Sequence, residues 1–382
     1  MHHHDHNRRR GGSRIAAGAA LLALVAALSA CSTQESGSSD ASAKAEAAGC
    51  DKHLKVAWMF AGPRDDVGFN ASHIAAKQEV QEHFGDCVEQ VETDNVPFSD
   101  EGGHIVERFL NDGTDVVIDA LGLAEITTDT CADYPDAHCL TIVGTGDLPD
   151  NVSGYYARTW LPQYAAGVAA GLTTETDAIG YVIAYDIPLI RGGVNAFVLG
   201  CREVNPDCRV RVININQYFA PPATARAATS LVDAGVDVLR GWLNDHSYCP
   251  VAAKRGVAVI PDYWEAESVC PKGRVTSTKY NWGGYYIEQL ESIMDGTWEQ
   301  RDNELISPDM FSLGEFGDDV EPAVREQVEE VFDQLTSGDY HPFVGPIRDT
   351  SGKLRVQDGE RLDDSFLYDQ WDWYVEGVVT GN

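Results

Sequence analysis

Basic residues are scarce in this sequence. It holds 28 lysines and arginines against 60 aspartates and glutamates in 382 residues, a formal net charge of −32 at pH 7. Because phosphate binding needs clustered basic side chains, this balance argues against a nucleic-acid partner and against adsorption on anionic lipid headgroups. The 43% of hydrophobic residues is too high for a disordered chain, and the length fits two or three domains of roughly 100–200 residues.

Motifs of the common cofactor and hydrolase sites are missing as well. The first apolar run is followed by F-A-G-P-R-D at 60–65 instead of the dinucleotide fingerprint G-x-G-x-x-G, and neither a P-loop nor a G-x-S-x-G elbow occurs. The cysteines include no C-x-x-C pair and no histidine at zinc-ligand spacing. We therefore expect no cofactor and no metal, and nothing in the sequence indicates an enzyme.

Residues 1–30 have the pattern of an export signal. Basic residues within 8–14 precede an uncharged apolar stretch at 15–28, which is too short for a stable membrane anchor. It ends in L-S-A-C, which resembles the bacterial lipoprotein box and implies cleavage before Cys31 and a diacylglycerol on its sulfur. An ordinary signal peptide, or twin-arginine export, is the alternative. The Ser-, Ala- and Gly-rich segment 31–49 is expected to be a flexible tether.

Eight cysteines remain after Cys31, and an even number fits an oxidising compartment. They are Cys50, Cys87, Cys131, Cys139, Cys201, Cys208, Cys249 and Cys270. We expect structural disulfides. Pairing in sequence order is attractive because two of the pairs would close short loops, although eight cysteines allow 105 pairings.

Short apolar runs alternate with amphipathic segments of helix length from residue 54 onward. The expected strands are 53–60, 88–91, 115–118, 139–143, 179–184, 210–214, 236–239 and 257–260. The expected helices are 71–84, 103–112, 192–201, 223–234 and 250–255. This cadence predicts an α/β fold with two doubly wound lobes of parallel strands. Ligands bind outside the carboxyl ends of such strands, so two facing lobes would share one cleft.

The loops after the expected strands are rich in rings, amides and carboxylates. These candidates are Asp66, Phe69 and Asn70 in the first lobe, and Arg191, Phe219, Asn244 and Asp262 in the second. Stacking rings beside polar groups at one sheet edge suit a flat heterocycle with polar edges. The competing interpretation for Phe69 is a ring folded inward at a helix N-terminus.

Several separated motifs point to one protein family. The run G-P-x-x-D-x-G-F-N-x-x-H at 62–73 resembles the opening motif of the basic membrane protein (BMP) family of substrate-binding lipoproteins, the purine- and nucleoside-binding branch of type I periplasmic binding proteins. Further matches lie at 151–167, 187–200, 276–283, 295–298, 341–347 and 372–379. The resemblance therefore covers essentially everything after the tether.

The resemblance implies two Rossmann-like lobes joined by crossing hinge segments, in the type I periplasmic binding protein fold. One lobe would comprise 50–155 and 277–310, and the other 156–276 and 311–382. Such a protein would be a monomer, lipid-anchored through Cys31 on the extracytoplasmic face of the cell membrane. It would bind a purine base or nucleoside and present it to an ABC permease. A lipoprotein that feeds a signalling kinase and an exported nucleoside-acting enzyme are the alternatives.

By analogy with the family, Phe69 and Phe219 would sandwich the purine ring. Asn70, Asn244 and Asp262 would hydrogen-bond its edge or a ribose. These roles make the planar ring the main source of affinity and the polar groups the source of discrimination.

Two further residues have competing interpretations. Arg191 would be a polar ligand or half of an interlobe ion pair, and Trp282 would seal the cleft or pack near the hinge. Many nucleoside-binding relatives carry a lysine shortly after the Thr-Ser pair at 276–277, where this chain has Tyr280. The N-W-G run at 281–283 is closer to relatives associated with free purine bases, so the base is expected over the nucleoside.

Overall fold

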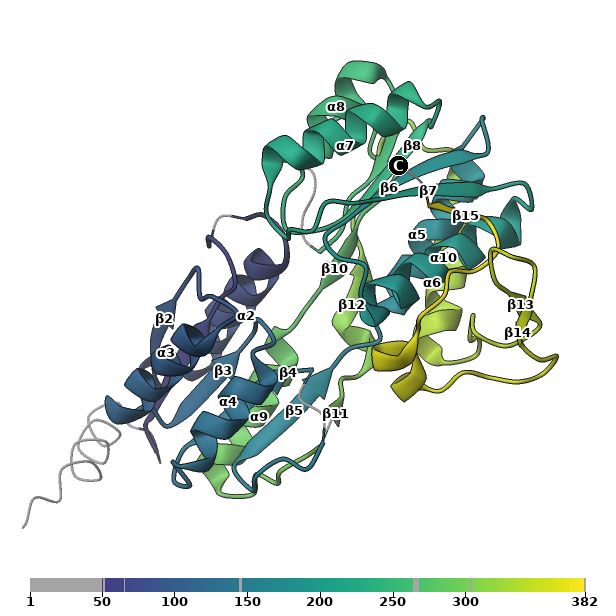
Figure 1. Cartoon of the computed structure of the whole chain (residues 1–382). Helices are drawn as coiled ribbons and strands as arrows, with labels where there is room; N and C mark the ends of the chain where they lie inside the picture. The colour runs from purple at the N-terminus through teal and green to yellow at the C-terminus, as the bar shows by residue number, and fades with distance from the viewer. Residues whose placement is uncertain are drawn as a thin grey trace, which may run out of the picture.

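The computed structural model describes residues 50, 52–64, 66–143, 146–263, 268–302 and 304–380. The expected export signal, the tether and the lipidation of Cys31 lie outside the described residues and stay predictions. Figure 1 shows two α/β lobes linked by extended segments.

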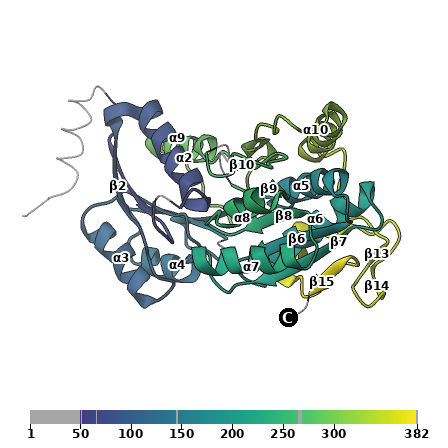
Figure 2. The same cartoon turned by 90° about the horizontal axis from the view of Figure 1, so that it is seen from above.

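The first lobe is built on a six-stranded parallel sheet with the order β11-β5-β4-β3-β1-β2. Its strands are β1 (Leu54–Met59), β2 (Val88–Thr93), β3 (Val116–Asp119), β4 (His138–Ile142), β5 (Val152–Tyr156) and β11 (Glu304–Leu305). Its helices are α2 (Phe69–Phe84), α3 (Asp100–Asn111), α4 (Ala124–Ala132) and α9 (Gly283–Asp295). Helices α2 and α9 cover one face of the sheet and α3 and α4 the other (Figure 2).

The second lobe repeats this plan with a five-stranded parallel sheet in the order β15-β7-β6-β8-β9. Its strands are β6 (Ala178–Ile183), β7 (Arg209–Asn214), β8 (Val238–Trp242), β9 (Ala258–Ile260) and β15 (Val378–Thr380). Its helices are α5 (Trp160–Thr173), α6 (Pro188–Val204), α7 (Pro221–Asp233), α8 (Tyr248–Arg255) and α10 (Pro322–Ser337). In Figure 1, α7 and α8 lie above the sheet and α5, α6 and α10 below it.

The chain crosses between the lobes in extended conformation. Strands β10 (Thr278–Tyr280) and β12 (Phe311–Leu313) form an antiparallel pair between them, and residues 157–159 connect β5 to α5 (Figure 1). Two doubly wound lobes joined by crossing segments are therefore confirmed. The lobe boundaries written from the sequence stay predictions. The short elements that remain are β13 (Ile347–Arg348), β14 (Leu354–Val356), η1 (Gly85–Cys87), η2 (Pro308–Met310) and η3 (Phe366–Gln370).

Helices α5 and α6 pack unusually closely because glycines face the partner helix. A Cβ atom on Gly167 would lie 2.0 Å from the carbonyl oxygen of Phe197, and one on Gly200 would lie 2.2 Å from that of Tyr164. Any larger residue at either position would force the helices apart. Helix α6 also starts earlier than the expected residue 192, because Pro188 is well placed in a first helical turn.

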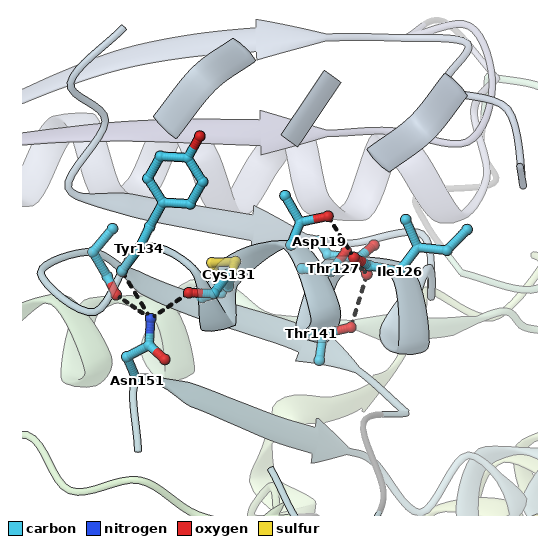
Figure 3. The surroundings of a disulfide bond; sticks show 10 residues. Asp119, Ile126, Thr127, Cys131, Tyr134, Thr141 and Asn151 are labelled. Carbon is cyan, nitrogen blue, oxygen red and sulfur yellow. Dashed lines mark hydrogen bonds between the residues drawn. A yellow bond between two sulfur atoms is a disulfide. The ribbon is translucent and has the colours of Figure 1, made fainter. Parts of the chain in front are cut away.

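All eight described cysteines are paired, and the sequence-order pairing is confirmed. The disulfides join Cys50 to Cys87, Cys131 to Cys139, Cys201 to Cys208 and Cys249 to Cys270. Figure 3 shows the second of these, which ties α4 to β4. Beside it, the Nδ2 atom of Asn151 lies within 3.0 Å of three carbonyl oxygens, those of Cys131, Tyr134 and Ala137. Among the described helices, none is long and apolar enough to cross a membrane.

Candidate functional site

Asp66 organises the turn between β1 and α2. Its carboxylate accepts hydrogen bonds from the backbone N–H groups of Gly68 (2.9 Å), Asn70 (3.1 Å) and Ala71 (3.0 Å), and only 1% of the residue is exposed. Asn70 and Ala71 belong to the first turn of α2 and Gly68 is its N-cap, so these N–H groups have no partner within the helix. A carboxylate there also interacts favourably with the helix dipole. Asp66 therefore fixes the position of Phe69 and Asn70.

Three rings gather at the start of α2. The ring centroids of Phe69 and His73 are 4.5 Å apart in an edge-to-face arrangement, and Trp282 stacks on His73 at 4.5 Å and 22°. The indole N–H of Trp282 donates to the hydroxyl of Ser72 at 3.1 Å. Trp282 is thus packed into the first lobe, at the start of α9, with 1% of its surface exposed.

The second lobe touches this cluster through Tyr263, which follows β9. Its ring lies 5.5 Å from that of Phe69 and 5.0 Å from that of Tyr280 on the crossing strand β10. Tyr263 adopts a φ of 76°, in the left-handed region that a bulky residue rarely occupies. A strained aromatic residue at the contact between two lobes marks a position where function is worth testing.

Backbone atoms also meet across the lobes, at Gly68 and Asn244. A Cβ atom on Gly68 would lie 2.9 Å from Cα of Asn244, closer than real Cβ contacts. Asn244 is itself held by its N–H, which donates to the carbonyl of Tyr218 at 2.7 Å. The lobes are therefore in direct contact at this edge, and the absence of a side chain at Gly68 permits it.

Asn70 contributes a buried acceptor without a partner. The residue is fully buried and its Nδ2 donates to the carbonyl of Pro63 at 3.3 Å, while its Oδ1 has no hydrogen-bond partner among the described residues. An unpaired buried acceptor costs about 1–3 kcal/mol. A donor supplied by a ligand would remove this cost.

Asp262 lies in a buried polar network of the second lobe. Its carboxylate accepts hydrogen bonds from the hydroxyl of Thr278 and from Nε2 of Gln163 at 2.7 Å, and it pairs with Arg240 at 3.1 Å. Both of its oxygens thus have protein donors, and 1% of the residue is exposed. Burial is the largest single influence on the pKa of Arg240 and lowers it, but the Asp262 carboxylate together with the nearby Tyr181 and Tyr248 raises the pKa overall.

The carboxylate at the end of β3 is likewise satisfied by the protein. Asp119 accepts from the hydroxyls of Thr127 (3.0 Å) and Thr141 (2.7 Å), as Figure 3 shows, and from the N–H groups of Leu121 and Gly122. Burial raises the pKa of Asp119 even though these hydrogen bonds oppose the shift. Asp119 therefore stabilises the turn that follows β3.

Two of the candidates lie apart from the ring cluster. Arg191 pairs with Asp186 at 2.8 Å and its guanidinium lies 5.5 Å from the ring of Tyr374, so its ion-pair partner belongs to the same lobe. Phe219 is 43% exposed, and no ring contact joins it to Phe69. The structure thus brings together Asp66, Phe69, Asn70, Asn244 and Trp282, while Asp262 lies in the polar network before Tyr263. The assignment of all eight residues to ligand binding stays a prediction.

Sequence reasoning passed over two residues of this region. Tyr263 follows the candidate Asp262 directly, but nothing in a sequence reports its positive φ or its contact with Phe69. Arg240 interrupts the apolar strand β8, and a single cation within a buried run was the available signal. Among the described residues, no group of three or more His, Cys, Asp or Glu side chains could hold a metal ion.

Comparison with known proteins decides the family. The model of the Bmp family, described as ABC transporter substrate-binding protein PnrA-like, matches residues 53–306. The chain belongs to this family. A purine-binding protein from Brucella abortus (strain 2308) is 30% identical to this Bmp protein over 339 residues, which cover 87% of this chain and 95% of the relative.

Other relatives of this Bmp protein agree on the class. A Haloferax volcanii ABC transporter protein with a provisional glucose-binding assignment is 28% identical over 341 residues, or 85% of this chain and 80% of the relative. The solved structure of an ABC transporter solute-binding protein from Conexibacter woesei superposes with a TM-score of 0.63 at 21% identity, over 75% of this chain and 98% of that one. The protein is therefore an extracytoplasmic solute-binding protein of the ABC transporter class, with the type I periplasmic binding protein fold, and not an enzyme.

Proposed function

We propose that this protein is the lipid-anchored, monomeric receptor of an ABC importer and that it binds a purine between its lobes. The free base is preferred over the nucleoside. Cys31 carries the anchor, and the permease recognises the closed form. The purine-binding relative from Brucella abortus supports the ligand class.

The observation that carries the proposal is the pairing of a ring with an orphaned acceptor at the contact between the lobes. Phe69 is half-buried, so part of its surface remains accessible, and the unpaired Oδ1 of Asn70 lies on the adjacent residue. A purine offers a planar face to the first and a ring or amino N–H to the second. Stacking would contribute about 1–3 kcal/mol per aromatic residue, by analogy with base stacking elsewhere.

The preference for a free base is supported by the state of Asp262. A ribose would need an acceptor for its hydroxyl groups, and both oxygens of this carboxylate already accept hydrogen bonds from Thr278 and Gln163. Asp262 is 1% exposed and already receives Thr278, Gln163 and Arg240, so a ribose hydroxyl could reach the carboxylate only by displacing part of this network. A free base makes no such demand.

Binding and closure are coupled in this proposal. An open form samples the closed arrangement, and a ligand held between Phe69 and the second lobe shifts the population toward closure. In this proposal the close approach of Gly68 to Asn244 belongs to the closed arrangement and is lost when the lobes open. The ligand and the lobe contacts therefore stabilise the same state.

Mass spectrometry of small molecules released by denaturing the purified protein tests the ligand class. We expect a purine base, and calorimetric titration should then rank adenine, hypoxanthine and guanine above inosine, adenosine and glucose. Binding of glucose with no response to any purine would overturn the purine assignment. Tighter binding of a nucleoside would overturn only the preference for the base. Separately, Cys31→Ser should move the protein from the membrane fraction to the soluble exported fraction.

A further inference from the structure

Arg240 is a fully buried cation in the middle of strand β8. The strand reads V-L-R-G-W, and all five of its residues are buried. A buried guanidinium is costly unless its five N–H donors all find acceptors, because it cannot lose its charge. We therefore expect hydrogen-bond acceptors around each of its N–H groups.

The acceptors come from three separate parts of the chain. The Nη1 atom donates to the carbonyl oxygens of Ile260 (3.0 Å) and Pro261 (2.9 Å), immediately before Asp262. The Nε and Nη2 atoms donate to Oε1 of Gln163 on α5 at 3.2 and 2.9 Å. Nη2 also pairs with Asp262 at 3.1 Å and donates to the hydroxyl of Thr278 on β10 at 3.3 Å.

One of these parts carries a ring next to Phe69, and another carries a ring that packs against that one. Tyr263 directly follows the 260–262 segment held by Arg240, and Tyr280 stands two residues beyond Thr278 on the crossing strand. The rings of Tyr263 and Tyr280 are 5.0 Å apart, and Tyr263 reaches the ring of Phe69 at 5.5 Å. The side chain of Arg240 thus connects β8 of the second lobe to the 260–263 loop and to the crossing strand β10, which carry Tyr263 and Tyr280.

We infer that Arg240 is a positioning residue for ligand binding, which holds the 260–263 loop and strand β10 in the arrangement that places Tyr263, backed by the buried ring of Tyr280, beside Phe69. The inference rests on the proposed purine site for its effect on affinity. Buried ion pairs often contribute little to stability compared with apolar residues of the same size, so a role in placing neighbours is a reason for this one to be present.

Arg240→Met tests the inference, with Arg240→Lys as the conservative variant. The matched control is Arg255→Met, since Arg255 lies on α8 of the same lobe and forms a partly exposed ion pair with Asp233. We expect Arg240→Met to weaken adenine binding in calorimetry at least tenfold, Arg240→Lys to recover part of the loss, and Arg255→Met to bind as the wild type does. Wild-type affinity in a folded Arg240→Met protein would overturn the inference.

Hydrogen exchange of the ligand-free protein separates this inference from the proposed function. Arg240→Met should speed amide exchange in peptides covering 258–263 and 276–282, while Arg255→Met should not. If the wild type binds no purine, the proposed function fails. Independently of that result, amide exchange in Arg240→Met equal to the wild type in both peptides would overturn the positioning role of Arg240. If Arg240→Met does not fold, Arg240→Met/Asp262→Asn removes both charges. An affinity and an exchange pattern equal to those of Asp262→Asn alone would then count against the inference.

Discussion

The two sides of the candidate site are built on different physical principles. On the first-lobe side, Phe69, His73 and Trp282 are held by ring packing, and the buried Oδ1 of Asn70 and Nε2 of His73 have no hydrogen-bond partner among the described residues. On the second-lobe side, Asp262 and Arg240 are held by hydrogen bonds that use both carboxylate oxygens. The first side therefore has a ring and a polar atom that a ligand could contact, whereas the polar groups of Asp262 and Arg240 on the second side already bond to each other and to the protein. Substitutions on the ring side should mainly change affinity, and those on the polar side should change stability as well.

Asp262→Ala should have the largest effect, because it leaves the Arg240 guanidinium buried without its counter-charge. Removing one partner of a buried ion pair typically lowers the free energy of unfolding by about 3–5 kcal/mol. Urea denaturation of the ligand-free protein measures this. The control is Asp233→Ala, which breaks the partly exposed pair with Arg255 and should cost at most about 1 kcal/mol. Equal losses in the two variants would mean that the polar side is not held by its charges.

Phe69→Ala should mainly reduce affinity. Loss of one stacking ring is worth about 1–3 kcal/mol, which weakens binding of a purine roughly 5- to 150-fold. Calorimetric titration with adenine measures the change. Phe98→Ala is the matched control, because Phe98 is an exposed phenylalanine of the same lobe, and it should leave affinity unchanged. Phe219→Ala extends the test: a loss of similar size would support the expected sandwich, and no loss would leave Tyr263 as the second-lobe ring beside Phe69.

Gly68→Ala should oppose closure of the lobes. The added Cβ would lie 2.9 Å from Cα of Asn244, so the closed form must shift while an open form need not. We expect a loss of about 1–2 kcal/mol in binding free energy, roughly 5- to 30-fold in affinity, with a smaller change in the stability of the ligand-free protein. Gly284→Ala is the control, since a Cβ there meets nothing within 4 Å. Wild-type affinity in Gly68→Ala would show that this contact is not part of the ligand-bound state.

The alternation of strands and helices could be predicted from the sequence because it rests on local periodicity. The strands expected at 53–60 and 179–184 correspond closely to β1 and β6, and parallel strands with helical crossovers have few other arrangements. Helix α5 was not expected, and its composition explains why. Twelve of its fourteen residues are buried, so it shows no polar face and no helical periodicity of hydrophobic residues.

The site could be predicted only in part. The sequence predicts where strands end, but it does not predict which distant side chains form hydrogen bonds or ion pairs with each other. The sequence placed Asp66, Phe69 and Asn70 after the first strand, and the structure has them there. It did not reveal that Arg191 has a counter-ion in Asp186, or that the oxygens of Asp262 are taken by Gln163 and Thr278 from distant segments. Long-range partners of this kind depend on how the lobes and crossing strands pack, which no local pattern records.

The contribution of His73, on the ring side, to the pH dependence of stability should be the smallest of these effects. It adds to the contributions of His138, His246 and His341, whose pKa values are also lowered by burial. Burial lowers the pKa of His73 from 6.5 to about 3, so the folded protein keeps this imidazole neutral while the unfolded chain protonates it as the pH falls through 6.5. Protonation of the unfolded state alone removes stability as the pH falls, by about 0.8 kcal/mol between pH 7.5 and 6.0 for one such group. Urea denaturation across this range measures the dependence, and few carboxylates titrate in it. His73→Gln, whose amide can still hydrogen-bond the hydroxyl of Tyr286 in either direction, should flatten the dependence by this amount, whereas a variant of the exposed His83 on the same helix should not. Identical pH dependence in the wild type and His73→Gln would show that His73 is not buried as a neutral group, and that the ring side is more open to water than its packing indicates.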